Sequence, residues 1–355
     1  MTMLSIIIKT LNEEDNISRC IESCLRVAKC VDCEIIVADS GSGDRTVEIA
    51  RRYPITIVQV RHRAEGRCGA GPQLGYQLSR GRYLYILDGD MELDAGFIRT
   101  AIAYLEKRPT VAGFGGVINE MRTENLEFKS RRQRNERYVQ ERGQAIEQPH
   151  QREYLAGGAL YSRAAIIEAE YLTDRNLHGN EEYDLGARLR AKGWTLIRSH
   201  EKAVDHYSHT KPTLSLMWHR VRSGMVLGVG EIVRAGFAQG YLAAVLREVR
   251  IVRIGIAVYG FWALAIVLAL ALRGSVAMPF VTVPFAGLIG LSLFMTFRTG
   301  SLKLALYSLL SWHVAALGLA GGLVARRVDP RLAIACVIFK PEGQAAADPV
   351  LAAAS

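Results

Sequence analysis

The chain has 355 residues, half of them hydrophobic, and a formal net charge of +9 at pH 7. This length allows one large domain and a smaller region, and the hydrophobic content lies at the upper end of the soluble range. Residues 254–325 are almost all apolar, which argues against a merely soluble basic protein. The excess of Lys and Arg indicates an anionic partner. We expect a lipid bilayer and phosphorylated substrates as partners, and no nucleic acid.

The first residues predict a strand and not a targeting segment. Residues 1–8 have no basic stretch and no long apolar core of the kind that marks a signal peptide, and residues 5–9 have the pattern of a strand. We therefore expect the N-terminal part of the chain to remain in the cytoplasm.

Four of the six cysteines, Cys20, Cys24, Cys30 and Cys33, have a spacing that a zinc site would allow. Cys20 and Cys24, however, fall on the apolar face of a predicted helix, where free cysteine behaves as a small hydrophobic residue. We therefore expect buried free thiols.

Strands and helices alternate through the first part of the chain. Strands are predicted at 5–9, 34–38, 55–60 and 82–87, separated by helical or loop segments, and Asp44 and Asp94 are placed to cap two helices. Residues 66–75 contain four glycines and a proline and predict a loop that enters a short helix. This alternation predicts an α/β fold with a mostly parallel sheet flanked by helices.

The segment Tyr83–Asp90 places Asp88 and Asp90 directly after five apolar residues. A short apolar run is typical of a strand buried on both faces, and ligands of open α/β sheets bind beyond the carboxyl ends of such strands. Paired carboxylates suit a hard divalent cation, Mg²⁺ or Mn²⁺, shared with substrate phosphates. Gly89 would let a ligand approach the backbone closely. A solvated Asp-Gly-Asp turn is the alternative.

Three motifs follow one another in this region: SIIIKTLNEE at 5–14, IIVADSGSGDRT at 35–46 and LDGD at 87–90. Their order and spacing resemble those of the family 2 glycosyltransferases, over roughly residues 4–210. The resemblance implies a nucleotide-sugar-binding domain with a GT-A type fold. It also implies a set of residues around the nucleotide sugar: Thr10, Asn12, Glu13, Asp39, Arg67, Asp88 and Gly89.

The same resemblance implies a metal site and a catalytic base. Asp88 and Asp90 match the family's Asp-x-Asp pair, which holds a divalent cation and the diphosphate. His206 matches a histidine that completes this site, with His209 as the second candidate. Glu182 stands where the family usually has an Asp that acts as the base.

The acceptor side is implied by further segments. Gly157 and Gly158 resemble the glycine-containing strand that lines the acceptor in this family, and Glu181 precedes the base. Arg220 and Arg222 would hold a phosphate of the donor or of a lipid acceptor, or would only attract anionic lipid.

Residues 119–153 are rich in Arg and Lys with interspersed acids. Most of this segment has the pattern of a solvated helix with internal ion pairs. The alternative is a basic flap over phosphates or anionic lipid headgroups.

The C-terminal third predicts membrane attachment. Residues 213–250 mix apolar and basic side chains as amphipathic helices at a membrane interface do. Apolar segments follow at 254–272, 276–297 and 304–325, and the first is long enough to cross the hydrocarbon core. A third crossing would leave Arg326, Arg327 and Arg331 outside, against the positive-inside tendency, so two or three spans remain open.

The expected organisation is a catalytic domain at 1–212, interface helices at 213–250, transmembrane helices at 251–330 and a C-terminal tail at 331–355. We predict a membrane-associated, inverting glycosyltransferase with a divalent cation as cofactor. It would move a sugar from a nucleotide diphosphate sugar to a lipid-linked, glycolipid or polysaccharide acceptor on the cytoplasmic face of the inner membrane. A polyprenyl-phosphate acceptor is the alternative. A non-catalytic membrane scaffold that retains the fold is the second alternative.

Overall fold

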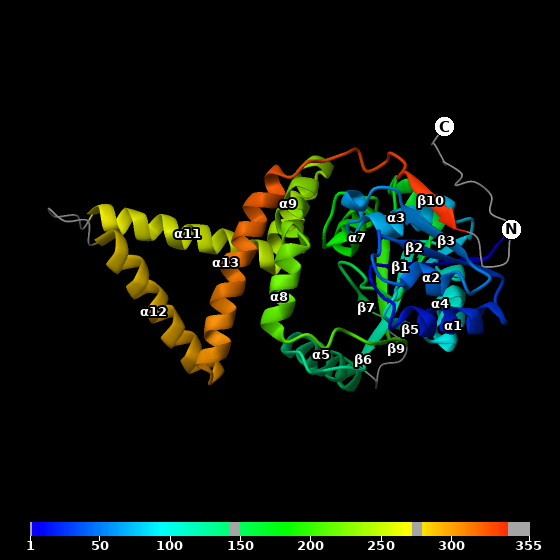
Figure 1. Ribbon diagram of the computed structural model, residues 1–355, viewed down its shortest axis with the longest axis horizontal. Helices are drawn as coiled ribbons and strands as arrows, with labels where there is room; N and C mark the ends of the chain where they lie inside the picture. The colour runs from blue at the N-terminus through cyan, green and yellow to red at the C-terminus, as the bar shows by residue number, and fades with distance from the viewer. Residues whose placement is uncertain (1, 143–149, 272–278, 340–355) are drawn as a thin grey trace. The chain divides into compact units, whose positions relative to one another are not determined.

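The computed structural model describes residues 2–142, 150–271 and 279–339 (Figure 1). The chain forms two compact units. The first comprises Met1–Thr213 together with Arg326–Ser355, and the second comprises Leu214–Ala325. The first unit is built on a ten-stranded sheet, and the described residues of the second are helical apart from their connections.

The sheet of the first unit has the order β10-β3-β2-β1-β4-β8-β6-β9-β5, and β7 pairs with β9. The strands are β1 (Leu4–Thr10), β2 (Cys33–Asp39), β3 (Thr56–Val60), β4 (Tyr83–Asp88), β5 (Met91–Leu93), β6 (Val111–Glu120), β7 (His150–Gln151), β8 (Ala159–Ser162), β9 (Thr195–His206) and β10 (Cys336–Phe339). The predicted α/β class with helices flanking a sheet is confirmed. The block β3-β2-β1-β4 is parallel as expected, but β8 runs antiparallel to both β4 and β6, so the whole sheet is mixed.

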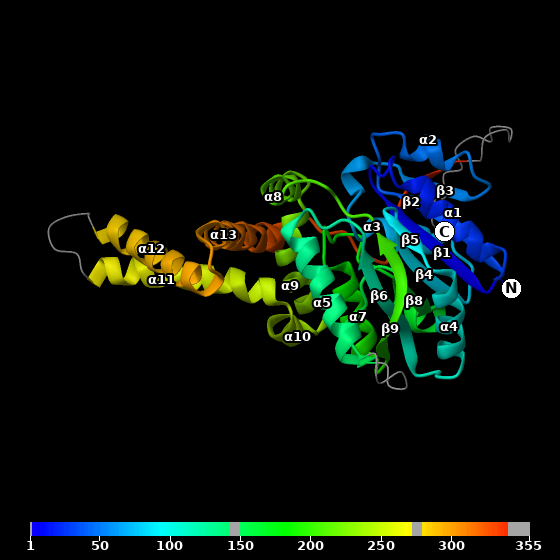
Figure 2. The ribbon, with the colours of Figure 1, turned by 90° about the horizontal axis from the view of Figure 1, so that it is seen from below.

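Helices cover both faces of this sheet (Figures 1 and 2). They are α1 (Ile17–Ala28), α2 (Thr46–Ala50), α3 (Ala70–Leu78), α4 (Ala95–Glu106), α5 (Leu126–Arg142), α6 (Arg163–Glu168) and α7 (Glu181–Ala191). Successive side chains of a strand point to opposite faces. Ile6 and Ile8 of β1 therefore join one apolar core with α1 and α4, while Ile7 joins a second core with α3 and α6. Burial on both faces explains the unbroken apolar runs of these strands.

Helix α3 corrects the loop predicted over residues 66–75, because the helix already begins at Ala70. Its glycines allow close packing on the sheet. A Cβ at Gly75 would collide with the side chain of Ile7, and one at Gly71 would lie 3.1 Å from Ser40 Oγ and 3.3 Å from Lys9 Cβ. Tertiary packing here overrides the low helix propensity of glycine.

The segment after the last helix returns to the first unit. Strand β10 pairs antiparallel with β3, although the sequence predicted only a tail at 331–355. Asn176 exchanges two hydrogen bonds with the backbone of Val328, both of 2.7 Å. Arg175 donates to the carbonyl oxygens of Leu332 and Ala333, each at 3.0 Å. These bonds fasten residues 328–339 to the unit that carries the sheet.

The second unit contains α8 (Thr213–Arg222, whose first residue belongs to the first unit), a 3₁₀ turn at Met225–Leu227, α9 (Gly228–Gln239), α10 (Leu242–Glu248), α11 (Arg250–Ala271), α12 (Pro279–Thr299) and α13 (Leu302–Val324). By length and composition, α11 and α13 can cross a membrane. The apolar stretch of α12 is shorter, at Thr282–Arg298, and the helix contains Pro284. Residues 276–278 of the predicted middle span lie outside the described residues.

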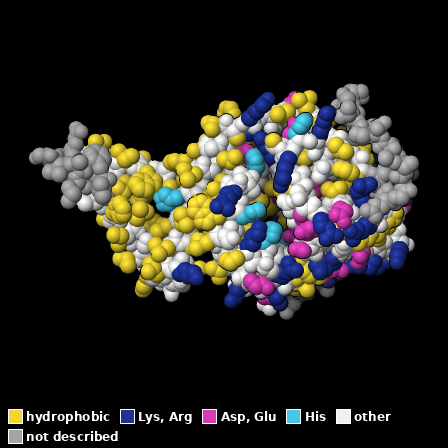
Figure 3. Space-filling view, in the orientation of Figure 1, with side chains coloured by type: hydrophobic (Ala, Val, Ile, Leu, Met, Phe, Trp, Pro, Cys, Tyr) yellow, Lys and Arg dark blue, Asp and Glu magenta, His cyan; other side chains and the backbone are white. Residues whose placement is uncertain are grey.

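Large apolar side chains remain exposed on these long helices, and they dominate this part of the surface in Figure 3. Leu264, Phe285, Leu293 and Leu317 are each more than half exposed. Contiguous exposed apolar surface of this kind marks contact with a membrane or another protein.

Candidate active site

The ends of three parallel strands bring the predicted nucleotide-sugar residues together. The register pairs Lys9 of β1 with Asp88 of β4, and Thr10 with Asp39 of β2. The backbone N–H of Gly89 donates to the carbonyl oxygen of Lys9 at 3.0 Å. Because parallel strands end at the same edge of a sheet, these residues lie close together at that edge. That they bind a nucleotide sugar stays a prediction.

Asp39 holds this edge of the sheet together by hydrogen bonds to other residues of the protein. Its fully buried carboxylate accepts hydrogen bonds from Thr10 Oγ1 at 3.0 Å and Gln59 Nε2 at 2.8 Å. It also accepts from the backbone of Gly41 and from Ser42. A contact from Asp39 to a base or ribose therefore stays a prediction, and its observed role is to hold the turn after β2.

The loops after β1 and β2 are tied to each other. Asn12 Oδ1 accepts from the N–H of Gly43, and the N–H of Asn12 donates to Ser42 Oγ, both at 2.8 Å. Asn12 has a positive φ of 58°, a backbone conformation that Asn tolerates better than most residues. The backbone N–H of Glu13 donates to Thr46 Oγ1 at 2.8 Å. The predicted Asn12 and Glu13 are thus held by hydrogen bonds to residues 42–46.

Gly89 is required for a reason that the sequence did not reveal. A Cβ at this position would lie 2.8 Å from Thr10 Cγ2 and 3.1 Å from Glu13 Cγ. The space beside its backbone is therefore filled by the end of β1. Close approach of a ligand, the reason expected from the motif, stays a prediction.

Lys9 forms the electrostatic centre of the site. Its ammonium nitrogen lies 2.9 Å from Glu181 Oε1, 3.2 Å from Glu182 Oε1 and 3.1 Å from Asp88 Oδ1. Burial alone would lower the pKa of Lys9, but the three carboxylates raise it well above its usual value, so the side chain stays charged. Lys9 thereby joins the first acid of the Asp-x-Asp pair to the start of α7.

Glu182 is a partly buried carboxyl whose pKa is poised for proton transfer. Burial raises its pKa most, Glu181 and Asp88 raise it further, and Lys9 opposes them, which leaves the pKa at about 7. A group with this pKa can accept a proton near neutral pH. Glu181 lies deeper, with 6% of its side chain exposed, and serves mainly to hold Lys9.

A second polar chain holds Asp90. His206 Nε2 lies 3.1 Å from Asp90 Oδ2, and its Nδ1 lies 2.7 Å from Glu120 Oε2. Arg131 Nη1 in turn lies 3.2 Å from Glu120 Oε1. Burial lowers the pKa of His206, but Asp90 and Glu120 raise it to about 10. The ring is therefore protonated on both nitrogens here and donates to both carboxylates. To bind a metal it would release the Nε2 proton, and Glu120 on Nδ1 would then orient the ring.

The chemistry of these side chains suits a divalent cation. Burial and the nearby Asp90 raise the pKa of Glu13 to about 8, and burial likewise raises the pKa of Asp88. Burial is the main cause of both shifts, and the repulsion between neighbouring carboxylates adds to them. A divalent cation bound here would favour the ionised carboxylates. Within the described ranges, however, no group of three His, Cys, Asp or Glu side chains has the geometry of a metal site. The side chains are of the types that bind such a cation, but in this structure they are not arranged as a coordination shell.

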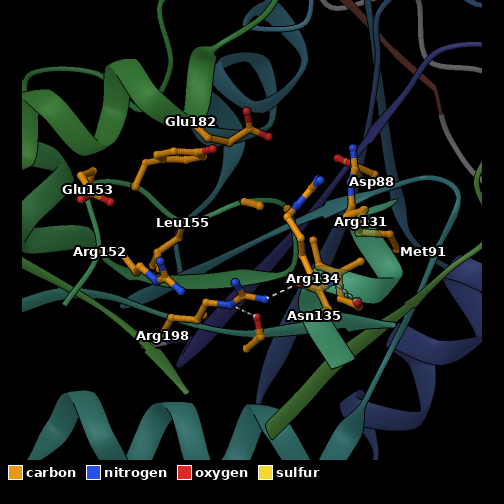
Figure 4. Close-up of a pocket in the computed structure, with 16 residues that line it drawn as sticks. Asp88, Met91, Arg131, Arg134, Asn135, Arg152, Glu153, Leu155, Glu182 and Arg198 are labelled. Carbon is orange, nitrogen blue, oxygen red and sulfur yellow. Dashed lines mark hydrogen bonds between the residues drawn. The ribbon is translucent and has the colours of Figure 1, made fainter. Parts of the chain in front are cut away.

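Beside the two polar chains lies a pocket of about 530 Å³ that contains both Asp88 and Glu182 (Figure 4). Gly157 lies on its wall, where a Cβ would be 3.1 Å from Asp88 Oδ2. Gly158 has a φ of 78°, and its N–H donates to the carbonyl oxygen of Ile86 in β4. This turn leads directly into β8, which begins at Ala159. Of the two predicted acceptor glycines, Gly157 thus adjoins the first acid of the pair, and Gly158 packs against Val204.

Other predicted residues lie apart from this pocket. Arg67 donates to the carbonyl oxygen of Asn176 at 3.0 Å, and His209 is exposed. Arg220 and Arg222 lie on α8 in the second unit, so their roles toward phosphate stay predictions.

Sequence reasoning missed Lys9 and Glu120. A lysine that directly follows the apolar residues 6–8 was a usable signal, because a lysine at the end of a buried strand needs anionic partners. Glu120 had no local signal, since its partner His206 lies 86 residues away.

Residues 5–169 match the family described as Glycosyl transferase family 2. The Bacillus subtilis protein called uncharacterized glycosyltransferase EpsJ is 37% identical over 90 residues, which is 25% of this chain and 26% of that protein. The dodecaprenyl-phosphate galacturonate synthase of Rhizobium johnstonii is 32% identical over 116 residues, 30% of this chain and 33% of that protein. The chain thus matches a quarter to a third of the length of these curated relatives.

Among solved structures, the fold resembles that of the mannosyltransferase PcManGT from Pyrobaculum calidifontis, solved in complex with GDP-Man and Mn²⁺. The TM-score is 0.55 at 16% sequence identity, and the likeness covers 90% of this chain and 87% of the other. At this identity the likeness concerns the fold alone.

Proposed function

We propose that the protein transfers a sugar from a nucleotide diphosphate sugar to an acceptor at a membrane. The premise is that residues 5–169 belong to the family 2 glycosyltransferases and have the predicted GT-A fold. One observation carries the proposal: a single pocket contains Asp88, on the proposed donor side, and Glu182, the proposed base. Lys9 links the two acids directly.

The donor would lie along the ends of β1, β2 and β4, near Thr10, Asn12 and Asp39. Asp88 and Asp90 would hold a divalent cation, with His206 completing the set. The neighbouring structure with GDP-Man and Mn²⁺ supports such a donor and cation. When bound, the cation would neutralise negative charge on the departing diphosphate.

In the transfer itself, the bond between the anomeric carbon and the diphosphate oxygen breaks, and the nucleoside diphosphate leaves with the electron pair. The acceptor hydroxyl oxygen forms the new bond to the anomeric carbon from the opposite face, which inverts configuration. Glu182 takes the hydroxyl proton, and Lys9 holds Glu182 in place and keeps part of it ionised.

Activity should therefore depend on the ionisation of Glu182. Because its pKa is about 7 and the base must be ionised, kcat/KM should rise as pH increases through about 7. Glu182→Gln should reduce transfer to a hydroxyl acceptor by about 100-fold or more and remove the rise. A profile that stays flat across this range in the unmodified enzyme would exclude Glu182 as the base.

A polyprenyl phosphate is the second candidate acceptor, favoured by the name of the Rhizobium johnstonii relative. Its phosphate oxygen is already anionic and needs no base. Transfer to a polyprenyl phosphate that survives in Glu182→Gln would favour this acceptor.

Membrane attachment would come from the second unit. Residues 326–339 belong to the first unit through β10. A chain that leaves and returns to the same side must cross the bilayer an even number of times, and α11 and α13 supply two candidate spans. We place the first unit on the cytoplasmic face of the inner membrane, because Arg247, Arg250 and Arg253 surround the start of the first span.

This topology predicts that tags at the two ends of the chain have the same accessibility. In inside-out inner-membrane vesicles, a protease should remove an N-terminal and a C-terminal epitope tag equally, and in right-side-out vesicles neither. Opposite protection of the two tags would require an odd number of crossings. Recovery of the full chain in the soluble fraction without detergent would exclude the membrane assignment altogether.

The function is tested with the full-length protein in neutral detergent. The protein is incubated with Mn²⁺ and a panel of nucleotide diphosphate sugars, and released nucleoside diphosphate is measured. Release with at least one donor, and its loss in Asp88→Asn, are expected. No release from any donor, with or without membrane lipids as acceptor, would favour the alternative of a non-catalytic scaffold.

A further inference from the structure

The pocket beside Asp88 and Glu182 is chemically divided. Figure 4 shows these two acids in the upper part of the view and Arg152 and Arg198 in the lower part, with Arg134 between them. We refer to these three residues as the arginine cluster. They come from α5, from the segment after β7, and from β9, so only the tertiary structure assembles them.

The arginine cluster has no acidic partner among the residues that the structure describes. Arg131, on the same pocket, is paired with Glu120 and Glu127. Arg198 instead donates to the carbonyl oxygen of Gly116 at 3.2 Å and to Asn135 Oδ1 at 3.0 Å. The Nε of Arg152 is buried without a hydrogen-bond partner, which is costly for a charged donor.

Two members of the cluster, Arg152 and Arg198, are also held in place before any ligand arrives, whereas Arg134 is exposed. The ring of Tyr138 packs under the guanidinium groups of Arg152 and Arg198, at 5.3 and 4.6 Å from the ring centre. The Tyr138 hydroxyl donates to the carbonyl oxygen of Arg198 at 3.1 Å. Burial and the neighbouring Arg152 lower the pKa of Arg198, as expected for two confined cations that lack an anion.

The spacing of α5 explains which of its many charges enter the pocket. Arg131, Arg134, Asn135 and Tyr138 recur at helical intervals and lie on one face, and Asn135 Nδ2 fastens that face to β6 through the Ile118 carbonyl oxygen at 2.7 Å. Arg132 pairs with Glu136 in solvent at 2.8 Å. The solvated-helix interpretation of this segment therefore holds for one face of α5, and the other face lines the pocket.

We propose that the arginine cluster binds a phosphate group of the acceptor while the reacting end of the acceptor lies between Asp88 and Glu182. The planar guanidinium groups present paired donors that match phosphate oxygens. This inference rests on the proposed transfer reaction and adds the acceptor's chemical class, a molecule that carries a phosphate group. The phosphate is either the nucleophile itself or belongs to a diphosphate that precedes a reacting hydroxyl.

Binding tests the cluster independently of turnover. Full-length protein in neutral detergent is titrated with geranyl phosphate, a short isoprenoid phosphate, and with uncharged geraniol, and the dissociation constants are measured by calorimetry. Arg134→Gln and Arg152→Gln are compared with Arg137→Gln, an exposed arginine on the same helix that does not line the pocket. We expect geranyl phosphate to bind more tightly than geraniol, and each pocket variant to weaken that binding about tenfold, with Arg137→Gln unchanged.

Equal binding of geranyl phosphate and geraniol would overturn the proposal, as would equal weakening by Arg137→Gln, which would indicate general attraction by net charge. Pocket variants that bind geranyl phosphate normally would also overturn it. Binding of a nucleoside diphosphate, measured in parallel, should change less than about twofold in the pocket variants. The arginine cluster comes from α5, the segment after β7 and β9, whereas the donor would lie along the ends of β1, β2 and β4. Geranyl phosphate binding by a protein that hydrolyses no nucleotide sugar would refute the transfer reaction and leave the phosphate site standing.

Turnover of Glu182→Gln then separates the two sources of the phosphate. Retained transfer to a polyprenyl phosphate identifies the phosphate as the nucleophile. Loss of transfer together with normal geranyl phosphate binding identifies it as part of the diphosphate that precedes a reacting hydroxyl. Either result supports a phosphate in the arginine cluster.

Discussion

Replacing Asp90 with Asn should abolish sugar transfer and leave the fold intact. If Asp90 helps to hold the cation, its loss should lower kcat by about 1,000-fold or more, since neutralising the leaving diphosphate supplies several kcal/mol of transition-state stabilisation. The fold should tolerate the change, because asparagine has the size of aspartate and its amide oxygen can still accept from His206 Nε2.

Asp94→Ala provides the matched control for Asp90→Asn. Asp94 caps α4 by accepting from the backbone of Gly96 at 2.9 Å and Phe97 at 3.3 Å, so its loss should cost about 1 kcal/mol of stability without touching the site. Thermal unfolding and donor turnover are measured for both variants. Near-normal turnover with unchanged metal dependence in Asp90→Asn would remove Asp90 from the metal site.

Replacing Lys9 with Met should destroy activity and also lower stability. The substitution keeps the length of the side chain but leaves Asp88, Glu181 and Glu182 without their shared cation. Removing one partner of a buried ion pair typically costs about 3–5 kcal/mol, because the remaining charge is uncompensated. Catalysis should fail in addition, since the same ammonium positions both Asp88 and Glu182.

The stability loss in Lys9→Met should depend on pH with a defined sign. In the folded protein the pKa of Glu182 is already raised from 4.5 to about 7, and without Lys9 it should rise further. A raised carboxyl pKa contributes stability below the unfolded value that is lost as pH increases through the folded value. The variant should therefore unfold at a temperature closest to that of the unmodified protein near pH 5, and much lower above pH 7.

Denaturation scans at several pH values measure this difference. Arg52→Met, which removes an exposed ion pair with Glu48, should leave stability nearly unchanged at any pH. A pH-independent loss in Lys9→Met would mean that packing, and not the charge cluster, determines the effect.

Local sequence determined most of the first unit. An apolar run such as residues 83–87 is typical of a buried strand, and Asp94 stands where a helix needs a cap; both are present in the structure. The position of Asp88 at the end of β4 was predictable from the apolar run before it, and its role with Asp90 in holding a cation stays a prediction. The apolar segments of the last third likewise became α11, α12 and α13.

Tertiary structure alone decided what those residues contact. The direction of β8 and the return of β10 to β3 depend on long connections, which no local pattern encodes. The salt bridges of Lys9 join residues up to 173 positions apart, and the arginine cluster combines side chains from three separate segments. Charged side chains find their partners through the folded backbone, so the sequence by itself determined which chemical groups are present, and only the fold determined which of them lie close enough to act together.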